Sequence, residues 1–165
     1  MSTNFAYPVL SPYLIVHDAA AAIAFYREAF GAEERFRLVD PDSGVIGHAE
    51  LLLSGELLMV ANEHPEWAKS ARTLGGTAVK LSLLVDDPDA AFARAVDAGA
   101  EALMPPGDQF YGFRSASLRD PFGHEWTLQR EIENVSPEEM QRRWEAMTSA
   151  CGEDGNRNNK QTPSA

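Results

Sequence analysis

The chain has 165 residues, 44% hydrophobic and 24% charged, which is the composition of a globular protein of one domain. A formal net charge of −11 offers no basic surface to nucleic acid or to an anionic membrane, so neither is an expected partner. The single cysteine, Cys151, cannot form an internal disulfide, and no segment has the pattern of a secretion signal or a membrane span. We therefore expect a cytoplasmic protein.

The chain contains two similar segments. The run Leu-Ile-Val-His-Asp at 14–18 matches Leu-Leu-Val-Asp-Asp at 83–87, and each is followed by an alanine-rich stretch that ends at Gly31 or Gly99. Each copy predicts a strand, an aspartate N-cap, a helix and a glycine at the helix end. This internal duplication indicates two structural repeats.

Hydrophobic spacing predicts the elements of the first repeat, which we assign to residues 11–62 after a flexible N-terminus over residues 1–10. The expected elements are a strand over 12–16, a helix over 19–30, and strands over 34–38, 46–53 and 56–61. Residues 63–77 contain Pro65, Gly75 and Gly76 and are expected to be a linker.

The second repeat, residues 78–130, follows the same order with less regular spacing. Its expected elements are a strand over 79–85, a helix over 88–98, a short strand over 102–104, and strands over 113–118 and 124–129. Ser136-Pro137 with Glu139 predicts a C-terminal helix within 136–149, before a disordered tail over 150–165. The residues expected between sheet and helix are Leu14, Val16, Ile23, Tyr26, Leu81, Leu83, Val85 and Phe92.

This βαβββ duplication resembles the vicinal oxygen chelate superfamily, which includes glyoxalase I, extradiol dioxygenases, fosfomycin-resistance enzymes and bleomycin-resistance proteins. The motifs at Gly47–Leu51, Asp108–Gly112, Arg119–His124 and Ser136–Met140 are similar to its PhnB-like branch. The resemblance implies an α+β fold, the glyoxalase/bleomycin resistance/dihydroxybiphenyl dioxygenase fold. Its two curved mixed sheets would enclose a cleft that holds a metal, a ligand or both, with a C-terminal helix added here.

The resemblance also implies where metal ligands would lie, at Ser11, Glu50, Lys80 and Thr127. Only Glu50 is a usual ligand type, and an ammonium at Lys80 would repel a cation, so we expect neither the usual metal centre nor another cofactor. His48 lies two residues before Glu50, so both side chains are expected on the same face of the strand. Three roles are open for the two residues: an acid/base pair, a pair of metal ligands, or a simple hydrogen-bonded pair. Lys80 is expected to neutralise Glu50.

Aromatic side chains in two glycine- or proline-containing loops suit a flat ligand on which they can stack. With the cleft positions, they make up the expected ligand-binding set: Tyr13, His48, Glu50, Trp67, Lys80, Phe110, Tyr111, Phe113 and Arg114. The alternative for Phe110 and Tyr111 is that they fill the domain's own core.

Two functions remain open. The first is a bleomycin-resistance-like protein that binds a small planar organic molecule in the inter-sheet cleft without a metal. The second is a divalent-metal-dependent lyase, isomerase or dioxygenase of the glyoxalase type, with His48 and Glu50 as its catalytic or metal-binding residues. A homodimer is expected in either case, because related proteins pair and because Met140, Trp144 and Met147 share one face of the C-terminal helix.

Overall fold

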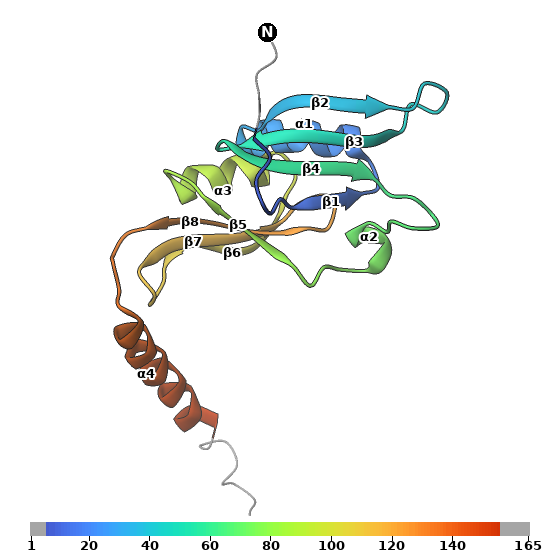
Figure 1. Cartoon of the computed structure of the whole chain (residues 1–165). Helices are drawn as coiled ribbons and strands as arrows, with labels where there is room; N and C mark the ends of the chain where they lie inside the picture. Colours follow the sequence, from blue (N-terminus) through green and yellow to red (C-terminus); the bar gives the residue numbers. More distant parts are fainter. Residues whose placement is uncertain (1–5, 156–165) are drawn as a thin grey trace, which may run out of the picture.

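The structure is a computed structural model that describes residues 6–155, with side chains described up to residue 149. Its first four-stranded sheet has the order β1-β4-β3-β2 (Figure 1). The elements of this first repeat are β1 (Tyr13–Val16), α1 (Ala19–Phe30), β2 (Glu33–Val39), β3 (Ile46–Leu53) and β4 (Glu56–Asn62). β1 is parallel to β4, and the other neighbouring strands of the sheet are antiparallel.

The second sheet repeats this topology in the order β5-β8-β7-β6, with β5 parallel to β8. Its elements are β5 (Lys80–Leu84), α3 (Pro88–Asp97), β6 (Glu101–Asp108), β7 (Phe113–Arg119) and β8 (Glu125–Glu131). A short helix, α2 (Ala71–Leu74), lies between the repeats, and α4 (Pro137–Gly155) follows the second one. The paired βαβββ fold with a C-terminal helix is therefore confirmed.

The repeated caps form as the sequence predicts at both helix starts. The Asp18 side chain accepts a hydrogen bond from the Ala21 backbone N–H, and Asp87 does the same for Ala90. Gly31 ends α1 in the left-handed region at φ 71°. The second repeat ends differently, because the right-handed Ala98 closes α3 and the positive φ falls on Gly99.

The hydrophobic core lies between each sheet and its helix, and the four core residues expected in the first repeat are buried. Those expected in the second repeat, Leu81, Leu83, Val85 and Phe92, are only partly buried and pack against the margin of the core. β5 is an edge strand, so Leu81 and Leu83 have a neighbouring strand on one side only.

The two repeats are joined through α1. The Tyr26 hydroxyl of α1 donates to the Asp120 carboxylate of the β7–β8 hairpin at 2.8 Å, and the Arg94 guanidinium of α3 donates to the Ala29 carbonyl at 2.8 Å. The His124 ring lies 3.3 Å from the Ile15 carbonyl, so this histidine also links the repeats. These contacts give the two sheets one shared core.

Three segments differ from the expectations. β6 continues through Pro105 and Pro106, which an edge strand tolerates because its outer N–H groups have no strand partner, and its pairing with β7 shifts register there. The linker contains α2, and the backbone of α4 continues to Gly155.

The expected flexible residues 1–5 and tail residues 156–165 lie outside the described part of the chain. Within residues 6–155, no helix combines the length and apolar character needed to cross a membrane.

Candidate functional site

The candidate site lies on the face of the first sheet that points away from α1. On β3, Ala49 and Leu51 belong to the core, and the alternation of a strand therefore places His48 and Glu50 on the opposite face. Glu50 is nevertheless only 2% exposed. A carboxylate this buried requires partners, and the structure supplies several.

The Glu50 carboxylate is held from two further segments. The Arg35 guanidinium of β2 forms an ion pair with Oε2, and the Tyr7 hydroxyl donates to Oε1 at 3.0 Å. The Arg35 guanidinium carbon also lies 5.8 Å from the centre of the Tyr7 ring and 6.0 Å from that of Phe36. The cost of burying the Glu50 carboxylate is thus compensated by the Arg35 guanidinium, which itself contacts two aromatic rings.

A row of hydrogen-bonding groups runs from Glu50 towards β1. His48 Nε2 is 3.4 Å from Glu50 Oε1, and His48 Nδ1 is 3.0 Å from the Tyr13 hydroxyl. With Nε2 donating to the carboxylate, Nδ1 accepts from Tyr13. Partial burial raises the pKa of Tyr13, so its phenol stays protonated near neutral pH. We call Tyr7, Tyr13, Arg35, His48 and Glu50 the Glu50 site.

Lys80 does not neutralise Glu50, which corrects our expectation. Its ammonium lies 3.1 Å from Glu125 Oε2, its partner in the register of β5 and β8, and its side chain is 67% exposed. Arg119 and Lys80 together hold the pKa of the Glu125 carboxyl below its usual range. The cation that compensates Glu50 is Arg35.

Two other candidates lie elsewhere. Trp67 is 71% exposed in the linker, where its ring stacks on His64 at 4.5 Å. Arg114 contacts Asp89 of α3 at 2.6 Å and Asp108 at 2.7 Å. It therefore lies on the helix-covered side of the second sheet, opposite to its strand neighbour Phe113.

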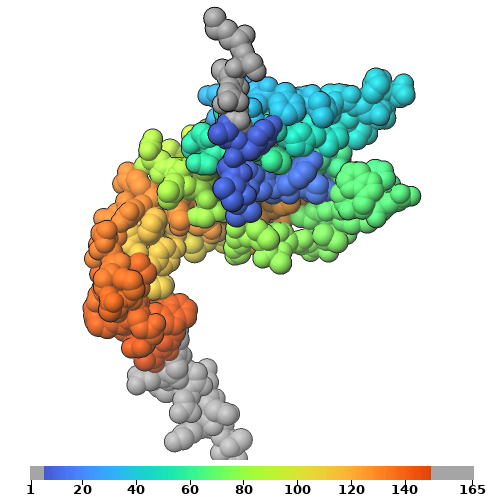
Figure 2. Space-filling model, in the orientation of Figure 1, coloured from blue at the N-terminus to red at the C-terminus, as the bar shows by residue number. Residues whose placement is uncertain are grey.

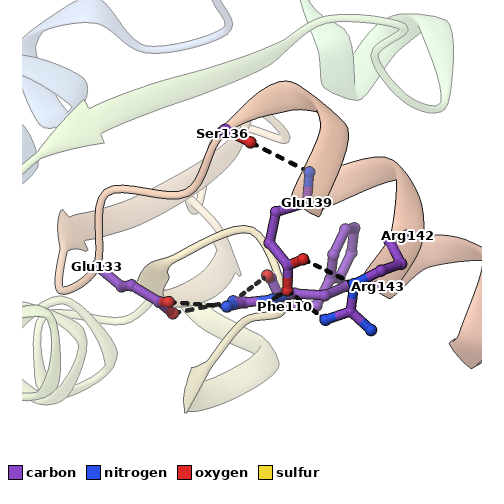
Figure 3. A network of polar contacts seen from close by, with 6 residues as sticks. All are labelled: Phe110, Glu133, Ser136, Glu139, Arg142 and Arg143. Atoms are coloured by element: carbon purple, nitrogen blue, oxygen red, sulfur yellow. Dashed lines mark hydrogen bonds and ion pairs between the residues drawn. The ribbon is translucent and has the colours of Figure 1, made fainter.

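The loop aromatics Phe110, Tyr111 and Phe113 contact one another at the end of the second sheet next to α4. Figure 3 shows Arg143 of α4 between Glu133 and Glu139, with its guanidinium donating to the Phe110 carbonyl at 3.0 Å. The Phe110 ring lies 5.6 Å from that of Trp144. The loop therefore contacts α4 through Phe110, whereas the Tyr111 hydroxyl lies 3.3 Å from the Ser115 hydroxyl of β7. None of the described contacts of these aromatic residues is with the Glu50 site.

Sequence reasoning missed Tyr7 and Arg35. In the pairing of β2 with β3, Glu34 lies opposite Leu51 and Phe36 lies opposite Glu50, so Arg35 is the extra residue of a bulge beside Glu50. Tyr7 belongs to a segment without hydrophobic periodicity, which the sequence predicts to be flexible. Only the presence of a buried carboxylate in need of a partner could have signalled Arg35.

A cavity of about 400 Å³ lies beside the site, between β1, the linker and β5. Tyr13 lines it from the first repeat, Val79 and Leu81 line it from the second, and His124 lies in its wall. This volume falls within the usual range of small-molecule sites. Through Tyr13, the cavity adjoins the row that leads to Glu50.

Residues 8–128 match the Glyoxalase/Bleomycin resistance protein/Dioxygenase superfamily, which covers most of the chain. The chain belongs to this superfamily. An uncharacterized protein of Mycobacterium tuberculosis H37Rv is 41% identical over 138 residues, which are 81% of each chain. The crystal structure of TioX from Micromonospora sp. ML1 has 29% identity and a TM-score of 0.60, covering 78% of this chain and all of TioX. The Arabidopsis thaliana protein At5g48480 has 28% identity and a TM-score of 0.62, covering 76% of this chain and all of its own.

The donor set at the Glu50 site does not fit the metal that metal-dependent members of the superfamily use. Glu50 already binds a guanidinium, which a cation would have to displace, and Lys80 offers an ammonium rather than a ligand. Among residues 6–155 there is no group of three or more His, Cys, Asp or Glu side chains placed to hold an ion. His48 and Glu50 alone would leave most of a coordination shell to solvent.

Proposed function

We propose that this member of the superfamily binds a small, planar organic molecule between its two sheets, beside the Glu50 site, without a metal ion. The observation that carries the proposal is the Arg35–Glu50 ion pair. An opposite charge next to a carboxylate stabilises its ionised form, which is what a bound cation would otherwise do. The site is then electrostatically complete without a cofactor.

The lining of the site supports a flat ligand. Tyr13, which is 48% exposed, presents its ring to the inter-sheet cavity, and Phe36 is 38% exposed next to His48. Aromatic faces with a few fixed polar groups are typical of sites for planar organic molecules.

We further propose a cytoplasmic location and membership of the PhnB-like branch. The motifs quoted above support the branch, whereas the likeness to a PhnB protein of Bacillus cereus, at 20% identity and a TM-score of 0.58, supports the fold alone.

We expect purified protein to hold an organic ligand and less than stoichiometric metal. Native mass spectrometry would show a mass excess that is lost on mild unfolding, and elemental analysis of the same sample would measure bound ions. His48→Ala should weaken retention of the ligand, whereas Trp67→Ala, which removes an exposed aromatic away from the Glu50 site, should not. Stoichiometric Ni, Zn, Fe or Mn would contradict the metal-free proposal.

The row of Tyr13, His48 and Glu50 favours a second candidate function. A phenol next to a histidine that is oriented by a carboxylate can transfer a proton to or from a bound molecule, as lyases and isomerases of the glyoxalase type require. Stoichiometric metal in the same elemental analysis would favour this enzyme over the binding protein.

We also propose a homodimer. Helix α4 projects away from both sheets (Figure 1), and Trp144 and Met147 on its apolar face are 48% and 45% exposed. Light scattering should therefore give about twice the 18.1 kDa of one chain. Met147→Glu should shift the protein towards monomer, and Ala146→Glu, which adds the same charge on a different face of the helix, should not. A wild-type monomer at micromolar concentration would contradict this proposal.

A further inference from the structure

Tyr7 occupies the Glu50 site in the manner of a ligand. It belongs to no strand or helix, and its segment lies over the first sheet (Figure 2). Its hydroxyl donates to Glu50 Oε1 at 3.0 Å, and the Arg35 guanidinium lies over its ring. The site therefore already holds a planar ring with a hydroxyl group, delivered by the protein's own N-terminal segment.

The way Tyr7 is held makes it displaceable. Tyr7 as a whole residue remains 60% exposed, and Val9 and Leu10 between Tyr7 and β1 are 108% and 88% exposed. From Pro12 onward the chain is fixed by the hydrogen bond of the Met59 N–H to the Pro12 carbonyl. The segment can therefore leave the sheet without disturbing the core, as the edge of the core begins only at Leu14.

The contacts of Tyr7 define which chemical group the subsite accepts. The Glu50 carboxylate accepts a hydrogen bond and repels an anion, and the Arg35 guanidinium beside it repels a cation, so the entering group must be a neutral donor. A guanidinium over the ring favours an aromatic face. Neither a simple hydrocarbon nor an aromatic carboxylate meets both conditions.

We propose that Tyr7 is an intrachain occupant of a phenol-binding subsite, and that the ligand of this protein carries a hydroxyaromatic group which displaces it. This deepens the proposed function and rests on it. A tether of a few residues gives Tyr7 an effective concentration in the millimolar range, so it competes with free ligand. Removal of Tyr7 should then tighten phenol binding by about tenfold or more, because Tyr7 fills the subsite in about nine-tenths or more of the wild-type population.

The test uses 4-methylphenol, which is the tyrosine side chain as a free molecule, and NMR titration of the backbone amides of residues 48–51. We expect 4-methylphenol to bind Tyr7→Ala at least about tenfold more tightly than the wild type. Tyr7→Phe, which keeps the ring and loses the hydroxyl, should be intermediate. Toluene and 4-methylbenzoate should bind Tyr7→Ala at least about tenfold more weakly than 4-methylphenol does. These controls leave Glu50 unchanged, so they do not depend on a variant of a buried residue.

Equal affinity of 4-methylphenol for wild type and Tyr7→Ala would overturn the inference, as would equal binding of toluene. The outcomes also separate this inference from the proposed function. If the wild type retains an organic ligand but Tyr7→Ala shows no preference for the phenol, the Tyr7 inference fails and the proposed function stands. If Tyr7→Ala binds the phenol selectively but the protein carries metal and no organic ligand, the subsite stands and the metal-free function fails.

Discussion

Replacement of Asp120 by alanine should lower the free energy of unfolding by about 3–5 kcal/mol. Asp120 is 3% exposed, and its Oδ2 accepts hydrogen bonds from the Tyr26 hydroxyl at 2.8 Å and the Trp126 indole N–H at 2.9 Å. Its Oδ1 accepts from the backbone N–H groups of Phe122 and His124 at 2.9 Å. A buried donor left without an acceptor costs about 1–3 kcal/mol, and alanine would leave several.

Because of the position of Asp120, the loss of unfolding free energy in Asp120→Ala should affect both repeats. Tyr26 belongs to α1 and Trp126 to β8, so the carboxylate joins the two repeats at the centre of their shared core. Burial, followed by the Asp120 charge, raises the pKa of Tyr26 well above its usual range, which keeps its hydroxyl a donor at any ordinary pH. In a chain of this length, the loss corresponds to a fall in Tm of roughly 6–20 °C.

Asp40→Ala is the matched control, measured in the same chemical denaturation experiment. Asp40 also accepts hydrogen bonds from two backbone N–H groups, those of Asp42 and Ser43, but it lies exposed in the β2–β3 loop. Water can replace its carboxylate, so the cost should stay near 1 kcal/mol or below. Equal losses for the two variants would show that the Asp120 network does not hold the repeats together.

The first repeat was predictable because its signals are local. The aspartate cap, the spacing of Ile23 and Tyr26, and the glycine at residue 31 all describe one helix and need no knowledge of the rest of the chain. The duplication then extended the same topology to the second repeat. Strand alternation likewise placed His48 and Glu50 on one face, and the structure brings them within 3.4 Å.

The partners of Glu50 were not predictable, because they depend on how strands pair. Lys80 shares its face of β5 with a cross-strand neighbour, Glu125, and this nearer carboxylate takes the ammonium. Arg35 lies beside Glu50 because of the register in which β2 pairs with β3, with a bulge at Arg35, and the sequence alone does not specify that register. The need for a cation beside a buried carboxylate could thus be anticipated, but its source could not.

The loop aromatics illustrate a different difficulty. Composition predicted that Phe110 and Tyr111 could stack on something flat, but it could not identify the partner. In the structure Phe110 contacts Trp144 of α4, a segment that the sequence had assigned to docking without a defined surface. The sequence identified both Phe110 and Trp144 as apolar residues, but only the tertiary structure showed that their rings are in contact.

Gly112→Ala should detach α4 from the second sheet and cost about 2–4 kcal/mol. Gly112 has φ 88°, and a Cβ there would lie 2.2 Å from the Glu133 carbonyl oxygen and 2.7 Å from Val135 Cγ2. The Gly112 carbonyl accepts hydrogen bonds from the Ile132 and Glu133 N–H groups at 2.9 and 3.0 Å. An added methyl therefore separates the β6–β7 loop from the segment that leads into α4.

The expected readout is local, because the sheets keep their own cores. Amide hydrogen exchange should speed up in residues 132–149, and the fluorescence of Trp144 should shift towards that of a solvated indole, while the amides of β3 keep their protection. Gly44→Ala is the matched control: its φ is 73°, and a Cβ there meets nothing within 4 Å. It should cost only the backbone strain of about 1–2 kcal/mol. If both variants lost the same stability and α4 kept its protection in each, the close approach at Gly112 would not be what fixes the helix.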